Sequence, residues 1–144
     1  MKLTRFTDYS LRVLIYLGMK EDGRVTIREI SEAYGISRNH LMKVVSLLTR
    51  MEYLDARRGP GGGIALARSP SEIVIADVIR DMEDDLNLVE CFCEDGSCLI
   101  KPMCVLKSAL NKALKAYLDT LEQYTLSDLL KPKTQLAQVF GMTA

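Results

Sequence analysis

Residues 26–51 of the chain read TIREISEAYGISRNHLMKVVSLLTRM, and this stretch decides the fold. Thr26 is typical of a helix N-cap, and Glu29 follows three residues later as in a capping box. Gly35 is typical of a helix end, and Ser37 of the next N-cap. We therefore expect a short helix, a tight turn and a longer helix with apolar residues at helical spacing. This is the helix-turn-helix pattern.

Two short alternating runs follow the second helix, on either side of a glycine-rich turn. Residues 53–58 read YLDARR, residues 59–63 read GPGGG and residues 64–67 read IALA. This pattern predicts a β-hairpin, which directly after a helix-turn-helix is a wing. A phosphate-binding nucleotide loop is also glycine-rich, but it needs a helix directly after the glycines, and here a strand-like run follows.

Further helices are expected on both sides of this unit. Thr7 is the expected N-cap of a first helix that closes near Gly18, and another helix is expected over 69–83. Over 103–124, apolar residues repeat at spacings of three and four and predict an amphipathic helix of about 30 Å. Because the chain offers no second long helix to cover this apolar stripe, we expect a homodimer; packing across its own domain is the alternative.

Composition excludes several classes of protein. The chain has 144 residues, 48% hydrophobic and 26% charged, with no net charge, as in one small globular domain. Residues 1–68 hold twelve Lys/Arg and seven Asp/Glu, and residues 69–144 the reverse, an asymmetry that often marks a nucleic-acid-binding face. The longest nearly apolar stretch, 13–19, is too short to span a bilayer, and the start lacks a signal-peptide pattern. We expect a cytoplasmic protein with no membrane partner.

The polar start of the second helix of the motif is the expected DNA-reading surface. There Arg38 can pair with guanine, Asn39 with adenine, and Lys43 lies one turn further on. Arg57 and Arg58 at the wing can reach phosphates or the minor groove. An ordinary solvated face is the alternative. The full expected DNA-binding set is Thr26, Ser37, Arg38, Asn39, His40, Lys43, Arg57, Arg58, Gly59, Gly61, Gly62 and Gly63.

Four cysteines lie within fourteen residues: Cys91, Cys93, Cys98 and Cys104. In the reducing cytosol such cysteines are metal ligands or redox centres more often than disulfides. An iron–sulfur cluster tolerates irregular spacing. Zinc usually takes paired C-x2-4-C ligands, and only Cys91 and Cys93 are that close, with one residue between them. A thiol redox switch needs no fixed spacing, so the spacing leaves all three open.

Four stretches match a known family: residues 3–9, 34–40 and 58–66, and the cysteine loop through residue 107. On these residues the chain resembles the NsrR-type, nitric-oxide-sensing branch of the winged-helix iron–sulfur regulators, a family that also includes IscR. The resemblance extends to about Leu130. It implies that Cys91, Cys98 and Cys104 bind a 4Fe-4S cluster, with a 2Fe-2S cluster as the alternative. Cys93 has no counterpart in the family's pattern.

The resemblance also implies a fourth ligand that is not a cysteine. IscR-like members have a histidine three residues after the last cysteine, and Lys107 stands there in this chain, which excludes that arrangement. NsrR-type members have an aspartate near the N-terminus that reaches over from the other subunit, and Asp8 matches it. The alternative interpretation of Asp8 is a carboxylate favoured by the helix dipole in a first turn.

The resemblance implies a homodimeric repressor that binds a palindromic operator in double-stranded DNA. Nitric oxide would release the repressor from its operator, and nitric-oxide detoxification genes would then be expressed. The alternatives are a winged-helix regulator with a zinc site or thiol switch, or a differently tuned iron–sulfur sensor. No enzyme is expected, because the chain has one histidine and no nucleophile or dinucleotide-binding motif.

The expected fold class is mainly α with a small β-hairpin wing. We expect a winged helix-turn-helix domain over 1–83 and a cluster-binding loop over 84–102. A dimerisation helix over 103–124 and a short helix and tail over 125–144 complete the chain.

Overall fold

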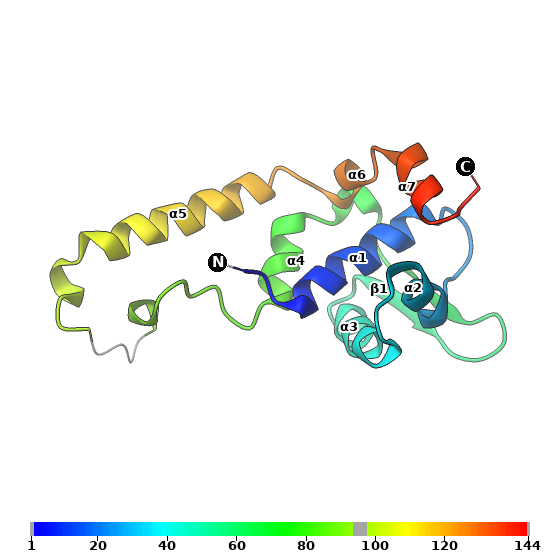
Figure 1. Ribbon diagram of the computed structural model, residues 1–144, viewed down its shortest axis with the longest axis horizontal. Coiled ribbons are helices and arrows are strands. Elements are labelled where there is room, and N and C mark those ends of the chain that lie inside the picture. The colour runs from blue at the N-terminus through cyan, green and yellow to red at the C-terminus, as the bar shows by residue number, and fades with distance from the viewer. Residues whose placement is uncertain (1, 94–97, 144) are drawn as a thin grey trace.

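The computed structural model describes residues 2–93 and 98–143 (Figure 1). Its elements are α1 (Arg5–Met19), α2 (Ile27–Tyr34), α3 (Arg38–Arg50), β1 (Leu54–Arg57), β2 (Gly63–Leu66), α4 (Ile75–Met82), α5 (Val105–Leu121), α6 (Leu126–Leu129) and α7 (Lys133–Val139), with short 3-10 helices at Pro70–Glu72, Glu90–Phe92 and Lys101–Met103. This confirms the expected fold class, mainly α with a two-stranded antiparallel hairpin. In the part of the chain that is described, no helix has the length and apolar character needed to cross a membrane.

The helix-turn-helix forms as predicted. The Thr26 hydroxyl accepts a hydrogen bond from the N–H of Glu29, and the Glu29 carboxylate accepts one from the N–H of Thr26 at 2.7 Å, which completes the capping box. Gly35 ends α2 with a φ of 66°, a conformation that costs little only for glycine. The Ser37 hydroxyl then caps α3 by accepting from the N–H of His40.

The hydrophobic core holds α3 against α1 and the base of the hairpin. Leu14 of α1, Ile30 of α2, and Leu41 and Leu48 of α3 are all fully buried. Full burial of one such side chain contributes about 1.5–3 kcal/mol. Because Leu41 and Leu48 lie on the inner face of α3, its polar residues lie on the outer face.

Helix α1 begins three residues earlier than predicted. Its N-cap is Thr4 and not Thr7, because the Thr4 hydroxyl accepts from the N–H of Thr7 at 3.2 Å. Thr7 is fully buried inside the helix. The helix ends at Met19, next to Gly18 as expected, and a Cβ on Gly18 would come within 2.6 Å of the side chain of Leu130. A larger residue at position 18 would therefore require the Leu130 side chain to shift.

The single helix predicted over 69–83 is wrong, because an extended segment interrupts it before α4. The N–H of Leu126 donates to the carbonyl of Ile73 at 2.8 Å, and the N–H of Ile75 donates to the carbonyl of Tyr124 at 2.9 Å. These backbone hydrogen bonds join two segments distant in sequence. They replace the bonds that a continuous helix would make over the same residues.

The long helix is shorter than the predicted 103–124. Helix α5 covers 17 residues, about 25 Å, and Cys104 is its N-cap. It extends away from the rest of the molecule (Figure 1), and none of its residues is buried. An uncovered apolar stripe is what a dimerisation helix would show in a single chain. The homodimer itself stays a prediction.

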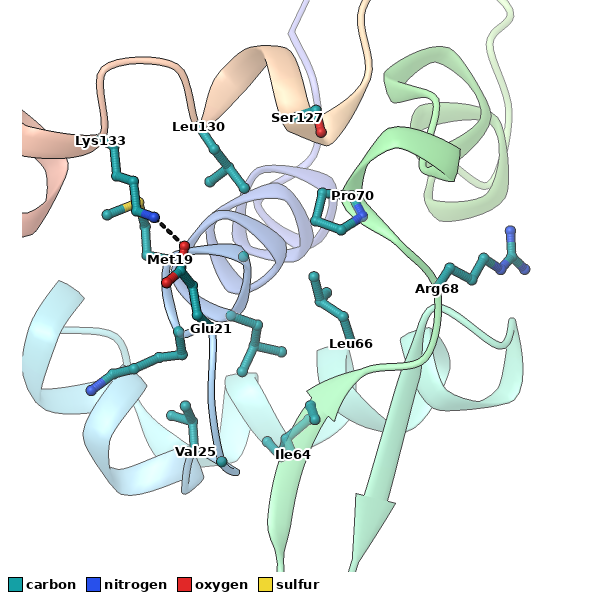
Figure 2. A pocket seen from close by; sticks show the side chains of 15 residues that line it. Met19, Glu21, Val25, Ile64, Leu66, Arg68, Pro70, Ser127, Leu130 and Lys133 are labelled. Carbon is teal, nitrogen blue, oxygen red and sulfur yellow. Dashed lines mark hydrogen bonds and ion pairs between the residues drawn. The ribbon is translucent and has the colours of Figure 1, made fainter.

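Two helices lie within residues 125–143, one more than was predicted for 125–144. Helices α6 and α7 lie beside α1 (Figure 1), and Leu126 is fully buried. Figure 2 shows Leu130 next to α1 and Lys133 paired with Glu21 just beyond the end of α1. The C-terminal residues thus complete the core that carries the helix-turn-helix. The division of the chain into the four expected regions stays a prediction.

Candidate functional site

Exposed polar residues gather at the start of α3, the expected recognition helix. Arg38, Asn39 and His40 are all exposed, and Lys43 is exposed one turn further along. The ring of His40 lies 6.1 Å from the ring of Tyr9, which places the only histidine at the contact between α3 and α1. The side chains expected to contact bases therefore share one accessible surface.

A cleft joins this helix to the wing, which we define as β1, residues 58–62 and β2. It is lined by Thr26 at the start of α2, by Val45 of α3, and by wing residues that include Arg57 and Arg58. The structure thus brings the cap of the support helix, the recognition helix and the wing arginines together. Such a surface, with one helix and a neighbouring basic hairpin, suits duplex DNA.

The wing glycines are required by the turn itself. Gly59, Gly61 and Gly63 have φ angles of 85°, 72° and 130°. A Cβ at Gly62 would lie 2.4 Å from the carbonyl oxygen of Arg57. The hairpin therefore explains these glycines without DNA, and their contact with DNA stays a prediction.

Arg24 organises the base of the wing and was missed by the sequence analysis. Its guanidinium donates to the carbonyls of Asp55 at 2.9 Å and Gly63 at 3.1 Å, and it also pairs with the Asp55 carboxylate. This pairing lowers the pKa of Asp55 below its ordinary value. Arg57 shares the same carboxylate at 3.2 Å. Arg57 is thus partly engaged within the hairpin, whereas Arg58 lies exposed at the turn.

Arg58→Ala should weaken binding to specific and random-sequence duplex DNA by similar factors. It should also lower the slope of log affinity against log salt by about one unit, because one phosphate or groove cation is lost. Fluorescence anisotropy over a range of KCl concentrations measures both. Lys131→Ala, which removes one positive charge from an exposed side chain outside the expected DNA surface and α5, is the matched control. A wild-type salt slope in Arg58→Ala would show that Arg58 does not contact DNA.

The cysteine-bearing segment separates α4 from α5. Cys91 and Cys104 are half-buried, Cys93 and Cys98 are exposed, and all four thiols are free. Residues 94–97 of the expected loop lie outside the described residues. Over 2–93 and 98–143, no three or more Cys, His, Asp or Glu side chains lie close enough together to hold a metal ion. The structure does not bring the three expected cysteine ligands together, and their role stays a prediction.

The donor chemistry of this segment nevertheless fits an iron–sulfur cluster. Its thiols are free and at least partly accessible, and thiolate is the usual ligand of cluster iron. The Cys104 sulfur already accepts a hydrogen bond from the N–H of Lys107 at 3.4 Å at the start of α5. N–H donors to ligand sulfur are among the contacts that tune such clusters.

Asp8 lies in the first turn of α1 and pairs with Arg12. Two guanidinium nitrogens lie 3.1 and 2.9 Å from the two carboxylate oxygens, and this bonding raises the pKa of Arg12. Arg12 also lies over the ring of Tyr34 at 5.8 Å, and its carbonyl accepts from the Tyr34 hydroxyl at 3.0 Å. Asp8 is thereby linked to the last residue of α2, directly before the turn into the recognition helix.

A second link joins the start of α1 to the cysteine-bearing segment and was also missed. The Glu83 carboxylate accepts hydrogen bonds from the N–H of Thr4 at 2.8 Å and from its hydroxyl at 3.2 Å. Glu83 directly follows α4, where the cysteine-bearing segment begins. The first turn of α1, with Asp8, is thus tied to the same part of the chain that leads to the cysteines.

Comparison with known proteins agrees with this architecture. The sequence model of the Rrf2 family, described as an iron-dependent transcriptional regulator, matches residues 3–132. The HTH-type transcriptional regulator NsrR of Bacillus licheniformis is 54% identical over 143 residues, 98% of this chain and 100% of that protein. NsrR of Bacillus subtilis is 49% identical over 144 residues, 99% of each chain. The solved structure of T. potens IscR covers 92% of this chain and 88% of that one, with 27% identity and a TM-score of 0.74.

These relatives span the helix-turn-helix, the wing and the cysteine-bearing segment together. They are named as transcriptional regulators and not as enzymes. The sequence identity and the exposed recognition surface agree on a regulator that binds DNA. The chain belongs to the Rrf2 family of winged-helix transcriptional regulators, and within it to the NsrR-type members.

Proposed function

We propose that this chain is a homodimeric repressor that senses nitric oxide through an iron–sulfur cluster and then releases its operator. The observation that carries the proposal is the chain of contacts from Asp8 through Arg12 to Tyr34. It connects an expected cluster ligand to the residue that precedes the turn into α3. These contacts support a coupling between the expected ligand Asp8 and the start of the recognition helix.

Cys91, Cys98 and Cys104 would hold the cluster, with Asp8 of the partner subunit as the fourth ligand, as the resemblance implies. Three thiolates and one carboxylate suit a 4Fe-4S cluster, and a 2Fe-2S cluster is the alternative. When bound, the cluster supplies iron that reacts with nitric oxide, most readily where a hard oxygen ligand exchanges faster than thiolate.

The chain couples this site to DNA because Asp8 can either pair with Arg12 of its own helix or bind the cluster of the partner subunit. A carboxylate engaged outside its own helix no longer neutralises Arg12. Arg12 then changes its contact with Tyr34, and the end of α2 shifts relative to α1. A coupling of about 1–3 kcal/mol, ordinary for allostery, changes DNA affinity about 5–150-fold.

DNA recognition follows from two copies of the α3 and wing surface. Pairing of the α5 helices of two chains would cover their apolar stripes and set the distance between the two recognition helices. A symmetric dimer of this kind reads a palindromic operator in double-stranded DNA. We place the protein in the cytoplasm, where reducing conditions keep thiols free. Its targets would be genes for nitric-oxide detoxification.

The proposal is tested by anaerobic reconstitution with iron and sulfide. The reconstituted protein should be brown and hold iron and sulfide, and it should select a duplex from a random-sequence DNA pool. Removal of the iron with a chelator should weaken binding to that selected duplex. A colourless protein that takes up zinc but no iron would contradict the proposal. A DNA affinity that does not change with iron content would also contradict it.

A further inference from the structure

The C-terminal segment 133–142 extends beyond the residues matched by the family's sequence model, and it packs on the helix-turn-helix. After α7, Gly141 has a φ of 63°, and the N–H of Met142 donates to the carbonyl of Ala137 at 2.8 Å. This left-handed ending turns the chain back on itself. Phe140 and Met142 are thereby placed against the hydrophobic core. The segment is an integral part of the folded body.

Three aromatic rings from three different elements meet at this place. They are Tyr16 of α1, Tyr34 of α2 and Phe140, which directly follows α7. The ring of Phe140 lies 5.2 Å from that of Tyr16 and 5.3 Å from that of Tyr34, whereas the two tyrosines are 6.2 Å apart. All three pairs meet edge to face, the geometry in which the positive ring edge faces the negative ring face. Phe140 therefore joins α1 to α2 through the two shortest contacts.

Tyr34 is the residue through which this contact reaches the recognition helix. Its hydroxyl bonds to the carbonyl of Arg12, and burial raises its pKa to about 12, so that it keeps its proton as the donor. Tyr34 is the last residue of α2, and Gly35 directly follows it in the turn to α3. The position of Tyr34 therefore sets where the turn begins.

The start of the same segment is held beside the wing. Lys133 pairs with Glu21, and both line a cavity together with Leu130 and with Ile64 and Leu66 of β2 (Figure 2). The segment therefore begins at the cavity that β2 also lines. Its first residue thus shares a cavity with β2 of the wing, and Phe140 packs on the last residue of α2.

We propose that Phe140 is a positioning residue for DNA recognition. By packing against Tyr16 and Tyr34, it holds the end of α2, and with it the start of α3, in the orientation that places Arg38 and Asn39 on base edges. Phe140 itself touches no DNA. Its effect is on sequence recognition and not on the attraction of the basic surface for phosphate.

The test compares Phe140→Ala with Val139→Ala in full-length protein purified anaerobically and matched for iron content. Val139 is the neighbouring residue and is 79% exposed. Phe140→Ala should bind the duplex selected by the wild-type protein about tenfold more weakly, because two aromatic contacts are lost. It should bind a random duplex of equal length as the wild type does. Val139→Ala should match the wild type on both.

Near-ultraviolet circular dichroism gives a second readout, since the chain has six tyrosines and no tryptophan. The tyrosine signal should change in Phe140→Ala, and Phe140→Tyr, which adds a chromophore of its own, should restore binding to the selected duplex. If Phe140→Ala does not fold, Phe140→Leu keeps the apolar volume without the ring and should show the same loss of selectivity. Wild-type selectivity in the folded variant, an equal loss in Val139→Ala, or no rescue by Phe140→Tyr would overturn the proposal. None of these measurements involves nitric oxide, so they stand apart from the proposed sensing function.

Discussion

Replacing Cys91, Cys98 or Cys104 with alanine should abolish cluster binding or weaken it severely, whereas Cys93→Ala should leave it intact. The first three match the ligand pattern of the family that the chain resembles, and Cys93 does not. Three thiolates leave no spare sulfur ligand, so the loss of any one exposes iron to water and to release. Cys93 is exposed, and its sulfur accepts a hydrogen bond from the Asn87 side chain at 3.6 Å.

Iron and sulfide per chain, measured after anaerobic reconstitution, decide this prediction. Cys93→Ala is the matched control, because it removes the same sulfur atom from the same segment. Iron loss in Cys93→Ala alone would show that the ligand assignment is wrong. Full iron content in Cys98→Ala would show the same.

Asp8→Ala should hold a cluster with altered iron spectra and respond more weakly to nitric oxide in DNA binding. The variant loses one oxygen ligand but keeps three thiolates, so the cluster still assembles. A carboxylate in a first helical turn contributes only about 0.3–1 kcal/mol through the helix dipole. This is small beside the 5–15 kcal/mol by which domains of this size are usually stable, so the variant should fold. A large effect must then come from ligation and from the freed Arg12.

Two further variants separate these causes. Asp8→Cys should keep the cluster and slow its reaction with nitric oxide, because thiolate replaces the more labile carboxylate. Arg12→Ala removes the partner of Asp8 but no ligand, so it should keep wild-type iron spectra while DNA binding changes. Identical spectra and identical nitric-oxide sensitivity in Asp8→Ala would reduce Asp8 to a helix-start carboxylate. Glu90 and Cys93 would then be the next candidates for the fourth ligand.

The helix-turn-helix and wing were predictable because their signals are local. Thr26, Gly35 and Ser37 act on backbone groups within three or four residues, and each does so in the structure as expected. The exposed face of α3 follows from the same periodicity. The winged helix-turn-helix and the placement of the expected DNA-binding residues on one surface could therefore be derived from residues 26–67.

The errors arose where distant residues decide the local structure. Thr4 and Thr7 both suit an N-cap, and Thr4 is held in that place by Glu83, which is far away in sequence. The helix expected over 69–83 is interrupted because the Ile73 carbonyl bonds to Leu126. The local sequence pattern of either segment cannot predict a hydrogen-bond partner that is distant in sequence.

Arg24 and Phe140 escaped the sequence analysis for the same reason. An arginine after a turn and a phenylalanine near the end of a chain are unremarkable until the fold brings Asp55 or Tyr34 beside them. The cysteines show the opposite case. Their spacing allows a shared centre, and the resemblance implies one, but metal binding supplies the energy that assembles such a site.

The central claim is tested most directly by titrating nitric oxide into anaerobic, cluster-containing wild-type protein bound to its selected duplex. Fluorescence anisotropy follows the DNA, and visible absorbance follows the cluster in the same sample. The account predicts that DNA is released as the cluster absorbance changes, and that protein stripped of iron shows no further response to nitric oxide. DNA that stays bound throughout the loss of the cluster absorbance would contradict it, as would equal release from the iron-free protein.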